Sequence, residues 1–110
     1  MIKIYNNIIP FKGYKAMNFF GLLFVRKGQT INEVDENHED IHTEQMKETL
    51  FIPFYLWYGL EWLIKLFIHG FKGHTAYRNI SFEKEAYENE SNLNYLDNRK
   101  HYNWFKRIFK

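Results

Sequence analysis

The sequence predicts an α+β domain, in which a small N-terminal antiparallel sheet or hairpin packs on three or four helices. Isoleucines and aromatic residues, separated by turn residues, occupy the first 27 positions and favour strands. From about residue 34 onward, apolar residues recur at helical spacing behind possible capping residues. The 110 residues are enough for one hydrophobic core, so the whole chain, 1–110, is interpreted as a single domain.

The composition excludes several classes of function. The chain has no cysteine, which excludes thiolate metal sites, cysteine nucleophiles and disulfide frameworks. The net charge of +2 is too small to indicate a nucleic-acid partner. Aromatic residues make up 20% of the chain, more than a small core needs, so some are expected on a surface, a groove wall or a lipid boundary.

The first strands are expected on either side of a turn. Isoleucines at positions 2, 4, 8 and 9 precede Pro10 and Gly13, which favour turns, and residues 17–25 then form a buried strand. The apolar run 18–25 is short and lacks a small-residue cleavage site, so a signal peptide is not favoured, although two lysines precede the run. A cytoplasmic location is favoured, and membrane association stays an alternative.

Two consecutive helices are expected next. The first covers about 34–50, behind three possible caps: Thr30, Asn32 and Asp35. Pro53 breaks or kinks it, and the second helix covers about 54–68. Across 50–68 only Glu61 and Lys65 are charged, one turn apart on one face. A buried central helix is the favoured interpretation, with a membrane-interface helix and a true span as alternatives.

The last third of the chain predicts two more helices. One covers about 82–90, is rich in glutamate, and has Asn79 and Ser81 as possible caps. The other covers about 93–109, and its apolar residues are Leu93, Leu96, Trp104, Phe105 and Ile108. Several basic residues also lie in this C-terminal stretch, and together with residues 50–68 they offer a possible contact with an anionic membrane surface.

The stretch NHEDIHTEQ contains a His-Glu-x-x-His motif. His38 and His42 lie four residues apart on one helix face, a spacing at which two imidazoles can bind one Zn²⁺ at about 2.0–2.1 Å. Glu39 lies beside that face, where its carboxylate can take a proton from a metal-activated water. A chance match is the alternative, because Asp40 puts a charge inside the motif. A zinc site also needs a third protein ligand, and a glutamate within 76–90 is the candidate.

NHEDIHTEQ, an apolar helix and then AYRNISFEKEAYENE together resemble the small gluzincin-like zinc metallopeptidase domains, over about residues 17–105. The resemblance implies a zincin-like fold, zinc as cofactor, and hydrolysis of a peptide or protein substrate. It implies that His38, His42 and Glu83 are the metal ligands and that Glu39 is the general base. Tyr87 stands where the family pattern has an Asp, so the carboxylate that orients a ligand histidine is missing or supplied elsewhere.

Several further residues are candidates with a weaker basis. Glu85 is a rival third ligand, because helix phase is not fixed to one residue by sequence. Gln45 lies on the histidine face, where it could hydrogen-bond a ligand or the substrate or simply be solvated. Tyr77 or Arg78 could stabilise an oxyanion, although the favoured interpretation is that Tyr77 packs and Arg78 pairs with a carboxylate. Three other histidines are interpreted as surface or loop residues: His69, His74 and His101. A zinc-holding domain without catalysis and a membrane-associated binding module are the alternative functions.

Overall fold

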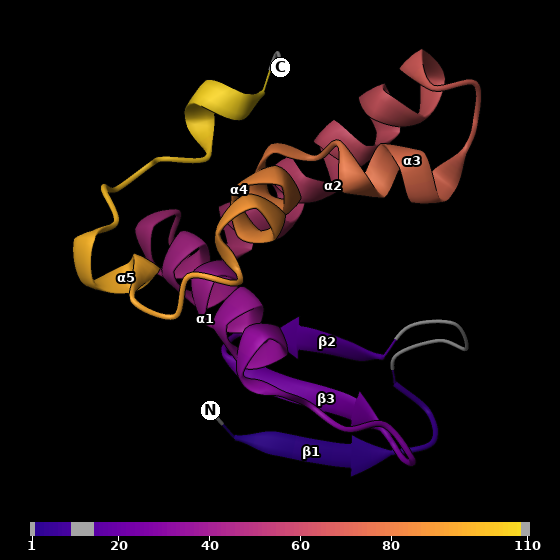
Figure 1. Cartoon of the computed structure of the whole chain (residues 1–110). Coiled ribbons are helices and arrows are strands. Elements are labelled where there is room, and N and C mark those ends of the chain that lie inside the picture. Colours follow the sequence, from indigo (N-terminus) through magenta and orange to yellow (C-terminus); the bar gives the residue numbers. More distant parts are fainter. Residues whose placement is uncertain (1, 10–14, 109–110) are drawn as a thin grey trace.

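The computed structural model describes residues 2–9 and 15–108, and it has the expected α+β class. In this part of the chain a three-stranded sheet is followed by five α-helices (Figure 1). The elements are β1 (Lys3–Asn6), β2 (Ala16–Phe19), β3 (Leu22–Arg26), α1 (Glu33–Glu48), α2 (Ile52–Ile68), α3 (Gly73–Arg78), α4 (Ser81–Asn89), α5 (Tyr95–Asn98) and a 3-10 turn (Phe105–Arg107). The short helix α3 was not expected from the sequence.

The strand expected over 17–25 is in fact a hairpin. Phe20 and Gly21 have φ angles of 52° and 92°, and they form a two-residue turn inside the apolar run. Phe19 on β2 therefore pairs with Leu22 on β3, and the two strands are antiparallel. The prediction of one strand was wrong because an unbroken apolar run contains no sign of this turn except a single glycine.

The sheet is mixed rather than antiparallel, which corrects the expected topology. Its strand order is β1-β3-β2, and β1 pairs in parallel with β3. β3 returns from the hairpin between β1 and β2, so β1 meets β3 instead of β2. Pro10 and Gly13, which were expected to mark the first turn, lie outside the described residues.

α1 begins at one of the residues that the sequence indicated. The side chain of Asn32 accepts a hydrogen bond from the backbone N of Asp35, and the Asp35 carboxylate accepts one from the backbone N of Asn32, at 2.8 and 3.2 Å. This reciprocal capping box satisfies two backbone donors at the helix start. The buried face of α1 is unusually polar: Asn37, His38, Ile41, His42, Gln45 and Met46.

α2 turns sharply away from α1. Leu50 and Phe51 both have positive φ angles, 64° and 63°, and the two helix axes are bent by 112°. Pro53 lies in the first turn of α2, where a missing N–H costs no hydrogen bond, so it begins the helix instead of kinking it. Within the described residues, no single helix has the length and hydropathy to cross a membrane; α1 and α2 meet these criteria only when counted together across their bend.

The favoured interpretation of residues 54–68 as a buried central helix was wrong. Only three residues of α2 are buried: Phe54, Glu61 and Lys65. The other apolar side chains of the helix are exposed or half-buried. The hydrophobic core instead joins α1, α2, the start of α4 and the C-terminal segment, through Met46, Phe54, Ile80, Phe82 and Trp104.

The helix expected over 93–109 is also absent from the described part of that range. α5 ends at Asn98, and Arg99 is extended, with φ −67° and ψ 133°. The Arg99 guanidinium lies between two buried carboxylates, 2.9 Å from Glu85 and 2.8 Å from Glu48. Pairing these carboxylates fixes the backbone at Arg99 and ends the helix, and asparagines at 92, 94, 98 and 103 weaken any helical preference.

Candidate metal centre

Two histidines of α1 and one glutamate of α4 bring their donor atoms together inside the protein. The Nε2 atoms of His38 and His42 lie 3.2 Å apart, and Glu83 Oε1 lies 3.1 and 3.0 Å from them. All three side chains are buried. Their types and mutual distances allow the group to hold a metal ion.

Glu83 is positioned because α4 is anchored at its first turn by α2. The Glu61 carboxylate accepts hydrogen bonds from the backbone N and the Oγ of Ser81, at 2.8 and 2.5 Å. These bonds satisfy a backbone donor that no residue of α4 itself satisfies. Asn79 and Ser81 were expected to cap this helix, but the N-cap is Ile80, which makes no side-chain cap bond. The cap is supplied from a distant part of the chain, which a local sequence pattern cannot show.

The other end of α4 is tied to the histidine helix. The Asn37 side-chain amide donates to the carbonyl oxygens of Asn89, Glu90 and Asn92, at 3.3, 2.8 and 2.9 Å. Asn37 directly precedes His38, so the same turn of α1 holds both α4 and the motif. This attachment sets the separation between the histidines and Glu83.

Gln45 determines which ring nitrogen of His42 carries the proton. The Gln45 Nε2 group donates to Phe82 O and Glu85 Oε1, both at 3.0 Å, and these atoms only accept. Gln45 Oε1 is therefore the acceptor that faces His42, and His42 Nδ1–H donates to it at 2.7 Å. In a neutral His42 the proton is on Nδ1, so the Nε2 lone pair points at His38 and Glu83. Gln45 thus bonds to one of the two motif histidines.

Glu90 fixes the tautomer of His38 in the same way. Its Oε2 accepts from His38 Nδ1 at 2.7 Å, which leaves the His38 Nε2 lone pair in the site. Tyr87, at the position where the resemblance predicts an Asp, packs its ring against His38 with centroids 4.5 Å apart. The orienting carboxylate is thus supplied elsewhere, three residues later. Glu90 is at the C-cap of α4, where no sequence motif marks it as a partner of His38.

Three lone pairs therefore converge with no proton between them. Two imidazole nitrogens and one carboxylate oxygen within 3.2 Å of each other need a cation, either a metal ion or added protons. Both histidines already have the outer hydrogen bonds that ligand histidines require. The residues present therefore fit a divalent metal.

The pKa values of His42 and Glu83 also indicate that the site favours a positive charge. Burial alone would lower the pKa of His42, but the carboxylates of Glu83 and Glu39 outweigh it and raise this pKa to about 9. Burial would raise the pKa of Glu83, and His42 and His38 outweigh it, so that the pKa lies well below its ordinary value. In the absence of a metal, protonated His42 balances ionised Glu83 near neutral pH.

Glu39 lies beside the three donors without joining them. Its Oε2 atom is buried and has no hydrogen-bond partner among the described residues. Burial raises the pKa of Glu39, and the two histidines offset this only in part. Asn18 of β2 and Thr43 each donate to the Glu39 carbonyl oxygen, at 3.0 and 3.1 Å, and so place this residue next to the sheet. A buried carboxylate oxygen without a protein partner is costly, and it calls for a water, a ligand or a reacting group beside it.

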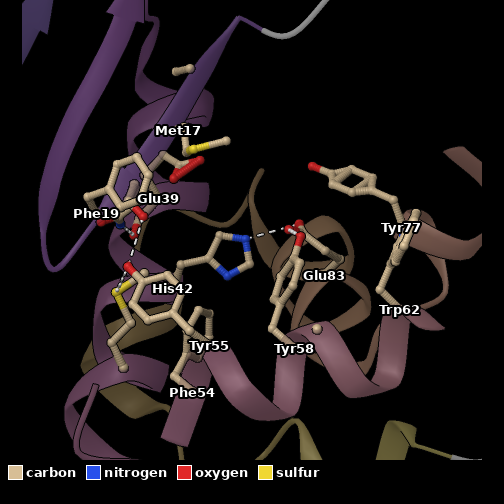
Figure 2. Close-up of a pocket in the computed structure, with 14 residues that line it drawn as sticks. Met17, Phe19, Glu39, His42, Phe54, Tyr55, Tyr58, Trp62, Tyr77 and Glu83 are labelled. Atoms are coloured by element: carbon tan, nitrogen blue, oxygen red, sulfur yellow. Dashed lines mark hydrogen bonds and ion pairs between the residues drawn. The ribbon is translucent and has the colours of Figure 1, made fainter. Parts of the chain in front are cut away.

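The donors open into a cavity of about 480 Å³ with mostly apolar walls. Its lining includes Met17 and Phe19 of β2 and several rings of α2. Figure 2 shows the Glu39 carboxylate and the Tyr77 hydroxyl on opposite sides of the space beside His42 and Glu83. A second hollow, of about 550 Å³ and more polar, reaches His38 and also borders Glu39 and Tyr77. The site is therefore accessible from outside.

Two tyrosines complete the wall. The Tyr58 hydroxyl of α2 donates to Glu83 Oε2 at 2.6 Å, which leaves Oε1 for the histidines. Tyr58 was not a candidate from sequence, because only the fold brings α2 against α4. Tyr77 lies 3.1 Å from the Tyr87 hydroxyl, and burial, then Glu83, raise the pKa of Tyr77. Its hydroxyl stays protonated and can donate.

The other candidates lie outside the donor group. Glu85 bonds to Arg99, Tyr95 and Gln45, so the structure brings Glu83 and not its rival to the histidines. The Arg78 guanidinium lies 3.7 Å from the centre of the Tyr87 ring and is exposed. Three further histidines are outside the donor group: His69 at the C-cap of α2, exposed His101, and His74 of α3, which lines the second hollow together with His38.

Comparison with known proteins adds no relative: no protein-family model, no curated protein and no solved structure matches this chain.

Proposed function

We propose that this protein is a zinc-dependent peptide hydrolase with a zincin-like arrangement, in which His38, His42 and Glu83 bind the metal and Glu39 is the general base. The observation that carries the proposal is the convergence of three donors next to a buried carboxylate oxygen, Glu39 Oε2, that has no partner in the part of the chain that the structure describes. A site that only holds a metal has no need of a second, uncompensated carboxylate beside it. General acid–base chemistry does need one.

Zinc is favoured by the chemistry of the donor set. Two neutral imidazoles and one carboxylate are a common protein ligand set for catalytic zinc, which keeps one position open. Hard cations such as Mg²⁺ and Ca²⁺ prefer oxygen ligands. When bound, zinc would lower the pKa of a water toward about 7 and polarise a carbonyl group.

The roles of the chain's own residues follow from their positions. Glu39 Oε2 accepts a proton from the attacking water and passes it to the leaving nitrogen, which its raised pKa favours. Tyr77, across the cavity, donates a hydrogen bond to the carbonyl oxygen as negative charge develops on it. The apolar walls exclude water and favour a peptide with a bulky apolar side chain near the cleaved bond.

Metal content measured by elemental analysis is the first test. Purified protein incubated with Zn²⁺ and then dialysed is expected to hold one zinc per chain, and Glu83→Gln is expected to lose it. Glu88→Gln is the matched control, because Glu88 lies on the same helix and its side chain is 54% exposed. Wild type without stoichiometric zinc would overturn the proposal.

Catalysis is tested separately on a library of quenched fluorescent peptides. Glu39→Gln is expected to keep its zinc and to lose at least about 100-fold in hydrolysis, the lower range for loss of a general base. Zinc in both proteins with hydrolysis in neither would reduce the proposal to a zinc-holding domain. Equal hydrolysis by both would exclude Glu39 as the base.

A further inference from the structure

The polarity of α2 is inverted relative to a helix that packs on a protein core. Its two charged side chains point inward, where Glu61 is 5% and Lys65 is 8% exposed. Each charged group has partners: Glu61 binds Ser81, and Lys65 Nζ donates to the carbonyl oxygen of Ile108 at 2.9 Å. All residues of α2 are described, and none of its exposed side chains is charged. An ordinary surface helix has the reverse arrangement.

The outward side of α2 is a continuous apolar stripe, called here the outer face: Leu56, Leu60, Leu63, Ile64, Phe67 and Ile68. These positions recur at intervals of three and four residues, so they lie along one side of the helix. Leu56 is 70% exposed and Phe67 is 63% exposed. Exposed apolar side chains are common singly, but a stripe of this length without a polar residue marks an interaction surface.

The charged side chains that accompany this face are basic. Residues 50–80 contain four charged side chains, of which Glu61 and Lys65 are buried and Lys72 and Arg78 are exposed. Beside α2 lies the C-terminal segment, held by the Lys65 bond and by a contact between Trp57 and Trp104 with ring centroids 6.0 Å apart. That segment, residues 99–108, contains no acidic residue and exposes Lys106 next to Phe105, while its Arg107 pairs with Glu88 of α4 at 2.6 Å.

We propose that the outer face of α2 binds the surface of an anionic lipid bilayer, with Lys72 and Lys106 contacting the headgroups. An apolar stripe on a helix that is followed by Lys72, and that lies beside the segment containing Lys106, matches an acyl layer beneath negative headgroups. A second copy of the chain fits less well, because a twofold interface would place this face and its basic border against themselves.

One tryptophan of α2 agrees with this orientation. Trp57 is three residues before Leu60 and seven before Ile64, so it lies on the side of the outer face, and it is 39% exposed. Its ring N–H donates to Glu61 at 3.0 Å. Tryptophan is enriched where a protein meets the boundary between water and lipid. Trp62 lies on the other side of the helix, where it lines the metal-centre cavity. The opposite side of α2 lines the metal-centre cavity, so a bound bilayer would lie close to that cavity.

Vesicle co-sedimentation tests the proposal without any reference to hydrolysis. The full chain is mixed with vesicles of phosphatidylcholine and phosphatidylserine, or of phosphatidylcholine alone, at low and high salt. We expect the protein to sediment with the anionic vesicles. The bound fraction is expected to be at least about fivefold lower on neutral vesicles, and to fall at high salt. Leu60→Glu is expected to lower the bound fraction at least about tenfold, because it places a charge in the apolar layer.

Leu93→Glu is the matched control, since Leu93 is 50% exposed and Leu60 is 53% exposed. Leu93 directly precedes α5, and Figure 1 shows α5 apart from α2. Unchanged circular dichroism in both variants excludes misfolding as the cause of lost binding. Protein that stays in solution with anionic vesicles overturns the proposal. So does a stable dimer in analytical ultracentrifugation that Leu60→Glu converts to monomer, because the occupant is then a second copy.

Discussion

Gln45 and Glu90 each hold the outer ring nitrogen of a motif histidine, and each contact leaves the inner lone pair in the site. The donor atoms are therefore oriented before any metal arrives, which lowers the entropic cost of binding. Two carboxylates, Glu83 and Glu39, lie near His42 and favour its protonated form. Its raised pKa of about 9 means that a proton competes with the metal.

The expected result is a zinc affinity that rises with pH. A metal needs the neutral form of His42, and this residue is mostly protonated below its pKa of about 9. Each proton displaced makes the affinity about tenfold higher per pH unit, and the gain ends as the pH passes the pKa. Competition with a chelating dye of known pH dependence, between about pH 6 and about pH 8.5, measures this rise. An affinity independent of pH would contradict the pairing of His42 with Glu83.

The position of Glu39, like the positions of the histidines, is set by contacts between secondary-structure elements. The β2–β3 hairpin presents Asn18, whose side-chain amide donates to Glu39 O and to Thr43 Oγ1, both at 3.0 Å. The turn of this hairpin requires positive φ at Phe20 and Gly21. Phe20 is held there by ring contacts with Phe51 and Tyr55, at 5.9 and 5.1 Å. Gly21 adopts its conformation without a Cβ penalty.

Gly21→Ala is expected to lower the free energy of unfolding by about 1–2 kcal/mol, because a Cβ disfavours φ near +92°. Gly59→Ala is the control from α2, where a Cβ would meet no atom within 4 Å. It is expected to raise the free energy of unfolding by up to about 1 kcal/mol through helix propensity. Urea unfolding followed by circular dichroism measures both. A neutral Gly21→Ala would contradict the turn.

Over the whole molecule, a buried ion network closes the C-terminal segment onto the helices. Arg99 joins Glu85 of α4 to Glu48 of α1, and Trp104 Nε1 also donates to Glu48. Burial would raise the pKa of Glu85, but hydrogen bonds from Arg99 and Tyr95 hold it below its ordinary value. Glu85 also accepts from Gln45, so the network reaches the candidate metal centre through one amide.

Arg99→Met is expected to destabilise the protein by about 3–5 kcal/mol, since it leaves two buried carboxylates without their cation. Lys47→Met removes the exposed partner of Glu44 and should change stability by less than about 1 kcal/mol. Thermal unfolding of the three proteins at one pH provides the comparison. Equal stability of Arg99→Met and Lys47→Met would show that the network contributes no stability.

The sequence by itself determined what depends on neighbours along the chain. Spacing in the His38–His42 motif places both imidazoles on one face, and Asn32 with Asp35 specifies where α1 begins. The α+β class also followed from local patterns. The first apolar run was misread because a single glycine turns it, and residues 93–109 were misread because their apolar spacing is helical although Arg99 is pulled into the core.

Only the tertiary structure decided which distant groups meet. It brought Glu83 rather than Glu85 to the histidines, supplied Glu90 and Tyr58, and turned the apolar side of α2 outward. Residues two apart on a helix differ by about 200° in direction, so the choice between the two glutamates rests on the rotation of α4. That rotation is set by Glu61 and Asn37, which are remote in sequence. Periodicity specifies a helix and its faces, whereas long-range contacts specify what each face meets.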